Sequence, residues 1–260
     1  MPGSIKPLQR YAVKVYYDGR AYYGFQPQKD KPTVGEAILK ALEASGLIVD
    51  RGEALFQAAS RTDRGVSALG QTIAFNSRER FEVGRLNAYL PEDVWAWAWT
   101  PVPLNFNPRR EALRRRYLYV APYGGEDLKA MIRAASIISS TITPPVEVKA
   151  TLAGEVIRFY FTSKRFTKGL IRKMVTAMLK VGKGELRLEE FRKRVEEAGF
   201  ERLPLPLAPP EPLILLEVEY TFPFQVNSQA VKRLMEKLQR QVCRLETLKA
   251  CLKFLGEISG

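Results

Sequence analysis

The stretch YAVKVYYDG, residues Tyr11–Gly19, alternates apolar and polar side chains and ends at Asp-Gly, the pattern of a half-buried strand followed by a turn. A helix is expected over Thr33–Gly46, because Thr33 can cap it, Glu36 follows three residues later and Gly46 ends it. Two strands are predicted next, at Ala54–Ser60 and Gln71–Ser77. A short helix is predicted at Val83–Val94, followed by a strand within Trp95–Leu104 that ends at Pro101. This order is strand, helix, strand, strand, helix, strand.

A looser version of the same order follows along the chain. Strands are expected at Arg114–Tyr123, Glu155–Ser163 and Leu213–Phe222, and helices at Glu126–Ser140, Gly169–Gly184 and Leu188–Gly199. The proline-rich run Leu203–Pro212 is interpreted as a linker or a loop that lines a cleft. The pattern predicts an α+β protein of two related halves, residues 1–103 and 104–224, with mixed or antiparallel sheets and a helical extension over residues 225–260.

The tail, Ser228–Ile258, has the apolar spacing of a long amphipathic helix or a pair of helices. Its apolar residues recur at steps of three or four, at Val231, Leu234, Leu238, Val242, Leu245, Leu248, Leu252 and Leu255. Two interpretations are open, a helix packed on the protein's own core and a dimerising coil. The first is favoured, because amphipathic helices mostly report tertiary packing.

The charge of the chain indicates a polyanionic partner. The 260 residues include 41 Lys and Arg against 28 Asp and Glu, a formal net charge of +13. Such a surface attracts RNA, DNA or acidic membranes. The first ten residues contain no apolar signal core and no window approaches the roughly 20 apolar residues of a membrane span, so a cytoplasmic protein is expected.

The absence of histidine narrows the chemistry. It removes the commonest general base, the usual metal ligand and every Ser-His or Cys-His nucleophile arrangement. The two cysteines, Cys243 and Cys251, match neither a disulfide framework nor a metal cluster, and no nucleotide-binding glycine loop is present. Catalysis by this chain, if any, would rest on carboxylates, Lys, Tyr, Ser or bound water.

The segment SRTDRG, Ser60–Gly65, places one carboxylate between two arginines. An extended backbone puts Arg61 and Asp63 on one face, and Gly65 permits a turn that leaves the acid at the end of a strand. Nearby guanidinium groups favour the ionised form, which suits a nucleophile or an anion that stabilises a cationic transition state. Taken alone, an ion-paired aspartate in a turn explains the segment better.

Two further segments combine basic and apolar or aromatic residues. In RRRYLYV, Arg114, Arg115 and Arg116 precede Tyr117 and Tyr119, a pattern that fits phosphate neutralisation plus base stacking as well as it fits a core strand. In TSKRFTKGLIRKMV, cations gather at the start of a helix, where they oppose its dipole unless a polyanion or a buried carboxylate is their partner. These cations are Lys164, Arg165, Lys168, Arg172 and Lys173. The apolar neighbours of Arg172 predict a partly buried, paired charge.

Together these segments resemble the tRNA pseudouridine synthase A (TruA) family from about Tyr16 to Tyr220. The segment SRTDRGVSALGQ is similar to the family's nucleophile loop. Four further segments match in the family's order, namely YYDGRAYYGFQPQ, FNPRREALRRRYLYV, GLIRKMVTAMLKVGKG and PPEPLILLEVEY. The chain departs from the family pattern at Ser67, where histidine is common, at Phe25, where tryptophan is, and at Pro212, where glycine is.

The resemblance implies two ferredoxin-like α+β halves that form an extended mixed or antiparallel sheet, with helices on one side and a basic catalytic cleft between the halves. By position, Asp63 is the catalytic aspartate, Tyr117 stacks on the uracil and Arg61 helps to hold the uridine. Arg172 pairs with Asp63, so that the carboxylate is held ionised from two directions by Arg61 and Arg172. RNA contacts are expected from Arg64, Arg114, Arg115, Arg116, Lys164, Arg165, Lys168 and Lys173.

The resemblance implies an isomerase that converts uridine to pseudouridine in the anticodon stem-loop of tRNA, without cofactor or metal and usually as a homodimer. The base must leave the stack to be reached. Attack by Asp63 on the sugar and attack on the base are both open. The competing interpretations are a synthase that acts on another RNA, a non-catalytic RNA-binding protein and a hydrolytic glycosidase, although the motif holds no second acid.

Overall fold

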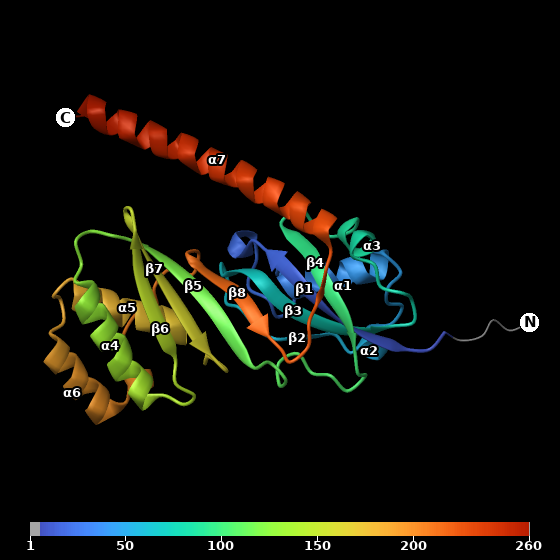
Figure 1. The fold of residues 1–260 in the computed structure, drawn as a ribbon, viewed down its shortest axis with the longest axis horizontal. Coiled ribbons are helices and arrows are strands. Elements are labelled where there is room, and N and C mark those ends of the chain that lie inside the picture. Colours follow the sequence, from blue (N-terminus) through green and yellow to red (C-terminus); the bar gives the residue numbers. More distant parts are fainter. Residues whose placement is uncertain (1–5, 260) are drawn as a thin grey trace, which may run out of the picture.

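One sheet passes through the whole structure, a computed structural model that describes residues 6–259 (Figure 1). Residues 1–5, which belong to the stretch without an apolar signal core, lie outside the described residues, as does Gly260. The described strands are β1 Gln9–Tyr17, β2 Gln57–Ala58, β3 Ser67–Ser77, β4 Val94–Val102, β5 Arg114–Pro122, β6 Glu147–Ala153, β7 Val156–Ser163, β8 Leu213–Glu219 and β9 Gln225–Val226. They follow the order β6-β7-β5-β8-β3-β1-β4-β9, with β2 beside β3.

The helices lie close to their predicted positions, except that α2 was not predicted and α3 is shorter than the expected Val83–Val94. They are α1 Val34–Ala44, α2 Arg51–Ala54, α3 Val83–Asn87, α4 Leu128–Thr141, α5 Leu170–Gly182, α6 Leu188–Ala198 and α7 Ser228–Ser259, with short 3-10 turns at Gly19–Ala21 and Phe200–Arg202. Thr33 caps α1 as predicted, since its Oγ1 accepts a hydrogen bond from the backbone N–H of Glu36 at 3.4 Å.

The structure confirms an α+β protein built on a mixed, mostly antiparallel sheet. The order predicted for residues 1–103 occurs twice, as β1-α1-β2-β3-α3-β4 and as β5-α4-β6-β7-α5-β8. The second run matches it more closely than predicted, because β6 was not expected, while α2 and the predicted α6 lie outside the shared order. In the described residues the parallel pairing joins β3 to β8, where Ser67 lies opposite Ile214 and Ala68 opposite Leu215. We call this short parallel pairing the seam. The division into residues 1–103, 104–224 and 225–260 stays a prediction.

Strand β1 is buried on both faces, so the prediction of a half-buried strand was wrong. Its Tyr11, Val13, Val15 and Tyr17 side chains join the main core. On the other face, Ala12 packs with Ala74 and Phe106 in a second, smaller cluster that also contacts Tyr220, Phe222 and Phe224. The reason is position: β1 lies between β3 and β4, and chain returning from β8 covers its second face.

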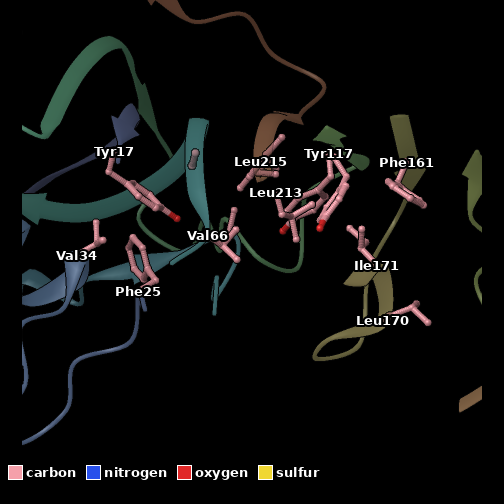
Figure 2. Packing of buried hydrophobic residues seen from close by; sticks show 14 of the residues in the cluster. Tyr17, Phe25, Val34, Val66, Tyr117, Phe161, Leu170, Ile171, Leu213 and Leu215 are labelled. Atoms are coloured by element: carbon pink, nitrogen blue, oxygen red, sulfur yellow. The ribbon is translucent and has the colours of Figure 1, made fainter. Parts of the chain in front are cut away.

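The main core continues across the seam. Figure 2 shows Val66 between two groups of core side chains, with Tyr17 and Phe25 on one side and Tyr117 and Leu213 on the other. Buried residues of α1, α4 and α5 join the same cluster. The apolar interior is therefore continuous at the point where the catalytic loop is predicted.

Three strand predictions need correction. The strand at Trp95–Leu104 does not end at Pro101, because Pro101 lies inside β4 opposite Tyr11. Strand β9 pairs only with Ala98 and Trp99, which leaves the edge of β4 open at Pro101, and an open edge tolerates a residue without an N–H. Strand β6, Glu147–Ala153, was not predicted, and the strand expected at Ala54–Ser60 is reduced to the two residues of β2.

The tail forms one helix, but the expectation that it packs on the protein's own core was wrong for most of its length. Near its start, Ala230 and Leu234 are buried, and Ala230 O accepts a hydrogen bond from Trp95 Nε1 at 3.0 Å. Beyond that, Figure 1 shows α7 extending past the sheet, and Val242, Leu245, Leu248 and Leu252 are exposed. No helix over residues 6–259 combines the length and the apolar character needed to cross a bilayer.

Candidate active site

The loop Ser60–Val66, which we call the aspartate loop, lies between β2 and β3 and leads into the seam. Its turn is closed by a hydrogen bond from the N–H of Val66 to the carbonyl of Asp63, at 3.2 Å. Gly65 has φ +83°, and a Cβ there would lie 3.0 Å from Pro210 Cγ. The conformation therefore favours glycine at this position, and a side chain there would also require Pro210 to shift.

The backbone of the aspartate loop is tied down by buried polar side chains that the sequence analysis did not single out. Gln71 accepts a hydrogen bond from Ser60 N at 3.1 Å and donates one to Ser60 O at 2.7 Å. Thr62 Oγ1 lies 2.7 Å from the hydroxyl of Tyr17, and Thr62 O accepts a bond from Phe25 N at 3.1 Å. The only sequence signal was that Gln71 and Tyr17 lie inside the matching segments.

Asp63 faces Arg172 across the seam, 109 residues away in the chain. Arg172 Nη1 lies 3.4 Å from Asp63 Oδ2, with 16% of the arginine side chain and 22% of the aspartate side chain exposed. Arg172 Nε also donates to Ala208 O at 2.6 Å, so the proline-rich run lines this site. The Asp63 pair is longer than the 2.7–2.9 Å of tight charge-assisted bonds, which leaves the carboxylate partly free for another group.

Arg61 and Arg64 lie on either side of Asp63 but do not contact it. Arg61 is exposed and forms no hydrogen bond or ion pair with another residue in the described part of the chain. Arg64 is also exposed, and its guanidinium carbon lies 4.2 Å from the centre of the Tyr23 ring. The carboxylate is therefore paired from one direction, by Arg172, and the expected second contact with Arg61 is not made in this structure.

Tyr117 lies beside the aspartate loop on β5. Its hydroxyl is 2.8 Å from Ser60 Oγ, and its ring meets Phe166 edge-on at 5.1 Å between ring centres. The side chain is only 6% exposed. Burial raises the pKa of the Tyr117 hydroxyl, with a further rise from the nearby charge of Asp63, so at neutral pH it is an uncharged phenol.

The three consecutive arginines of β5 separate onto two faces of the sheet. Arg114 and Arg116 are exposed on the face opposite Tyr117, and each pairs with Glu219, at 2.9 and 3.3 Å. Arg115 lies on the same face as Tyr117 and is buried. Since Arg115 offers no free guanidinium surface, the predicted RNA contact does not fit it.

Arg115 instead joins three loops. Its Nη2 donates to Ala59 O at 2.8 Å and to Arg109 O at 3.0 Å, and its Nη1 donates to Lys164 O. Ala59 directly precedes the aspartate loop, and Lys164 follows the end of β7. Burial lowers the pKa of the Arg115 guanidinium, which nevertheless remains a cation at neutral pH.

The remaining side chains predicted to contact RNA differ in whether they already bind other residues of the protein. Lys164, Arg165 and Lys168 are exposed in the segment between β7 and α5. Lys173 is already engaged, because its Nζ donates to Glu201 O at 2.6 Å and lies 5.7 Å from the centre of the Phe200 ring. Within the described residues no cluster of three or more Cys, Asp or Glu could hold a metal ion.

Comparison with known proteins agrees with this geometry. Residues 126–221 match a family model described as tRNA pseudouridine synthase. The chain is 35% identical to the tRNA pseudouridine synthase A of Pyrobaculum arsenaticum, covering 95% of this chain and 96% of the relative. It is 37% identical to that of Pyrobaculum calidifontis, with the same coverage, and 33% identical to that of Methanothermobacter thermautotrophicus, with 90% of each chain covered. The protein therefore belongs to the tRNA pseudouridine synthase A family.

Proposed function

We propose that this protein converts uridine to pseudouridine in the anticodon stem-loop of tRNA, with Asp63 as the nucleophile. The observation that carries the proposal is the position of Asp63 in a turn at the seam, 3.4 Å from Arg172 of the other half. A carboxylate that is partly exposed and has one cationic partner suits nucleophilic catalysis. Full-length similarity to enzymes named tRNA pseudouridine synthase A supports the tRNA substrate.

The proposed architecture is two related ferredoxin-like halves with a basic cleft between them. The support is topological, because β2-β3-β1-β4 and β6-β7-β5-β8 have the same order and each half places its helices between the same strands. The parallel pair β3–β8 joins the halves, and the aspartate loop enters the sheet at that pair. The cleft would therefore open where Asp63, Tyr117 and Arg172 meet.

The proposed reaction is an isomerisation, so its product contains every atom of its substrate. Asp63 attacks the sugar or the base, and on either route the bond between N1 of uracil and the sugar breaks. Uracil then turns and its C5 forms the new bond to the sugar. The bond made by Asp63 breaks, the proton leaves C5 and N1 takes up a proton. No co-reactant is consumed, in keeping with the expectation that no cofactor or metal is used.

Tyr117 enters the proposal as a surface for the flipped base. The raised pKa of the Tyr117 hydroxyl makes it a poor base at neutral pH. Stacking on its ring can offset part of the few kcal/mol that it costs to unstack the target base from the RNA. The ring is covered in this structure, with Phe166 against it. A uracil would therefore stack on Tyr117 only after Phe166 moves, together with the basic segment that carries it. Arg61, exposed beside Asp63, is proposed to hold the uridine.

The proposed RNA contacts follow from exposure. Arg64, Lys164, Arg165 and Lys168 are exposed on segments that border the site, so they are proposed to bind phosphates near the flipped uridine. Arg114 and Arg116 project from the other face of the sheet, where they would meet a more distant part of the RNA. Arg115 is proposed to position the aspartate loop rather than to bind RNA.

The test is incubation of the protein with an unmodified tRNA transcript, followed by mapping of pseudouridine along it. Asp63→Asn should abolish product while tRNA binding persists, because the amide keeps the shape of the side chain and removes the nucleophile. The matched control is Glu211→Gln, which changes another acid beside Gly65 that makes no ion pair in the described structure. This control should retain activity.

Each other outcome contradicts a part of the proposal. Full product from Asp63→Asn would exclude this residue as the nucleophile. Free uracil among the products would indicate a hydrolytic glycosidase. Binding without product from the unchanged protein would indicate a non-catalytic RNA-binding protein, and pseudouridine outside the anticodon stem-loop or only in other RNAs would change the substrate.

We also propose that the active form is a homodimer.

A further inference from the structure

Helix α7 carries an apolar face that the described part of the protein does not cover. The exposed fractions are 49% for Val242, 60% for Leu245, 53% for Leu248 and 70% for Leu252. A folded monomer seldom leaves so many large apolar side chains along one element in water, and such surfaces mark interaction sites. Figure 1 shows this part of α7 running free above the sheet.

An ion pair joins the far part of α7 to the body of the protein. Lys249 Nζ lies 3.7 Å from Glu155 Oε2, on the turn between β6 and β7, and both side chains are mostly exposed. An exposed ion pair of this kind contributes little. The ion pair therefore orients α7 without covering its apolar residues.

The spacing of these residues is symmetric about Leu245. From Leu245 the apolar positions lie three and seven residues away in each direction, at Val242 and Leu238 on one side and at Leu248 and Leu252 on the other. If a second α7 lay antiparallel with a two-fold axis at Leu245, Leu238 would face Leu252 and Val242 would face Leu248. Every apolar position of the face would then meet an apolar position.

A two-fold interface needs such self-complementarity, because the same surface patch is used by both copies. A chance partner protein would impose no symmetry on the spacing. The cations of the helix lie on another side, since Arg233, Lys237, Arg240 and Arg244 recur at steps of four, three and four residues. An RNA would bind that basic side by its phosphates and would leave the apolar face uncovered.

We infer that α7 is a dimerisation helix, which pairs antiparallel with α7 of a second copy through Leu238, Val242, Leu245, Leu248 and Leu252. The inference deepens the proposed homodimer by naming its interface. It does not rest on the proposed reaction, because it is tested by mass and by crosslinks rather than by pseudouridine. The basic sides of the paired helices remain exposed in this arrangement.

The first experiment is sedimentation equilibrium of the full chain at micromolar concentrations. The unchanged protein should have twice the mass of one chain. Leu245→Glu places two charges at the axis and removes two buried leucines per dimer, so the dissociation constant should rise by on the order of 100-fold or more. Thr247→Glu, on the side of the helix away from the face, is the matched control and should leave the dimer intact.

The second experiment fixes the direction of pairing. Val242→Cys and Leu248→Cys are made separately, each with Cys243→Ser and Cys251→Ser, and the two proteins are mixed and oxidised. Antiparallel pairing predicts the mixed disulfide, because residue 242 faces residue 248. The two copies of residue 242 would lie six residues apart along the paired helices, about 9 Å of helix rise, which is too far for a disulfide between them.

The outcomes separate the alternatives. A monomeric unchanged protein, or a Leu245→Glu variant that remains a dimer, would overturn the inference. Disulfides formed within each single-variant preparation, without the mixed product, would overturn antiparallel pairing. A Leu245→Glu variant that keeps the parent mass but loses tRNA affinity would assign the face to RNA. Circular dichroism checks that each variant keeps its helix content.

Discussion

Two arginines from the second half hold the aspartate loop in different ways. Arg172, on α5, approaches the carboxylate of Asp63, and its other donor binds one backbone carbonyl. Arg115, on β5, has no carboxylate partner among the described residues and donates to three backbone carbonyls. Arg172 therefore interacts with the charge of Asp63, whereas Arg115 holds the backbone of the loops that it joins.

The difference has a physical consequence. A buried cation without a counter-ion loses hydration worth several kcal/mol, which hydrogen bonds of about 1.5–3 kcal/mol each to a charged donor can offset. Arg115 is such a buried cation without a counter-ion, so its replacement should mainly lower the free energy of unfolding. Arg172 is partly hydrated and faces the carboxylate, so its removal should be felt mainly in the reaction.

Arg172→Met should have the largest effect. Loss of the cation that faces the carboxylate should lower kcat by about 10²–10³-fold, the range found when a preorganised electrostatic contact is removed from an active site. The free energy of unfolding should change by less than for Arg115 variants. Steady-state kinetics on a tRNA transcript checks this, and a raised KM with unchanged kcat would make Arg172 a residue for RNA binding only.

Arg115→Met should lower the free energy of unfolding by about 2 kcal/mol or more, because it leaves the buried carbonyl of Ala59 without its donor, at about 1–3 kcal/mol, and also removes the donor of the two part-buried carbonyls of Arg109 and Lys164. Urea unfolding measures it. Arg115→Lys is the control, since it keeps the charge and can restore one bond, and it should recover part of the loss. If Arg115→Met were as stable as the parent but lost tRNA affinity, the predicted RNA contact would be right after all.

Thr62→Val should have a smaller effect on both quantities. It removes the 2.7 Å bond to Tyr17 but keeps the shape of the side chain, so about 1 kcal/mol of stability should be lost. Tyr17→Phe removes the same bond from the other partner, and the double variant should cost little more than either single change. Additive losses would show that the two hydroxyls do not act as a pair.

Lys168→Ala should have the smallest effect. One exposed phosphate contact contributes modestly, so tRNA affinity should fall a few-fold and the salt dependence of binding should become shallower by about one unit. Titrations at several salt concentrations check the slope. A slope unchanged by Lys168→Ala would remove this residue from the proposed interface, whereas a flat response of the unchanged protein would count against a polyanion partner.

The predicted elements show where sequence patterns succeed. Helix α1 and strands β1 and β5 carry strong periodicity and clear end signals, so their existence was predictable. Strand β6 was missed although Val148, Ala150 and Leu152 alternate with Glu147, Lys149 and Thr151, the pattern of a half-buried strand. Its signal is short, at seven residues, and the strand lies at the edge of the sheet beside β7.

The candidate site divides in the same way. Asp63 stood out by its charge context, and its partner Arg172 followed from the family resemblance rather than from spacing. The clamp by Arg115 and the bonds of Gln71 and Thr62 could not be predicted, because hydrogen bonds to backbone carbonyls leave no pattern in the side-chain sequence. Alternation along a strand could have separated Arg115 from Arg114 and Arg116, had the register been applied to the basic run.

By itself the sequence determined most of the element order, the basic surface, the absence of histidine chemistry and the amphipathic character of the tail. Each of these depends on local periodicity or on composition. Only the tertiary structure decided that β1 is buried on both faces, that Asp63 meets one arginine instead of two, and that most of α7 lies free of the core. These depend on which distant segments come to lie together, and 109 residues separate Asp63 from Arg172.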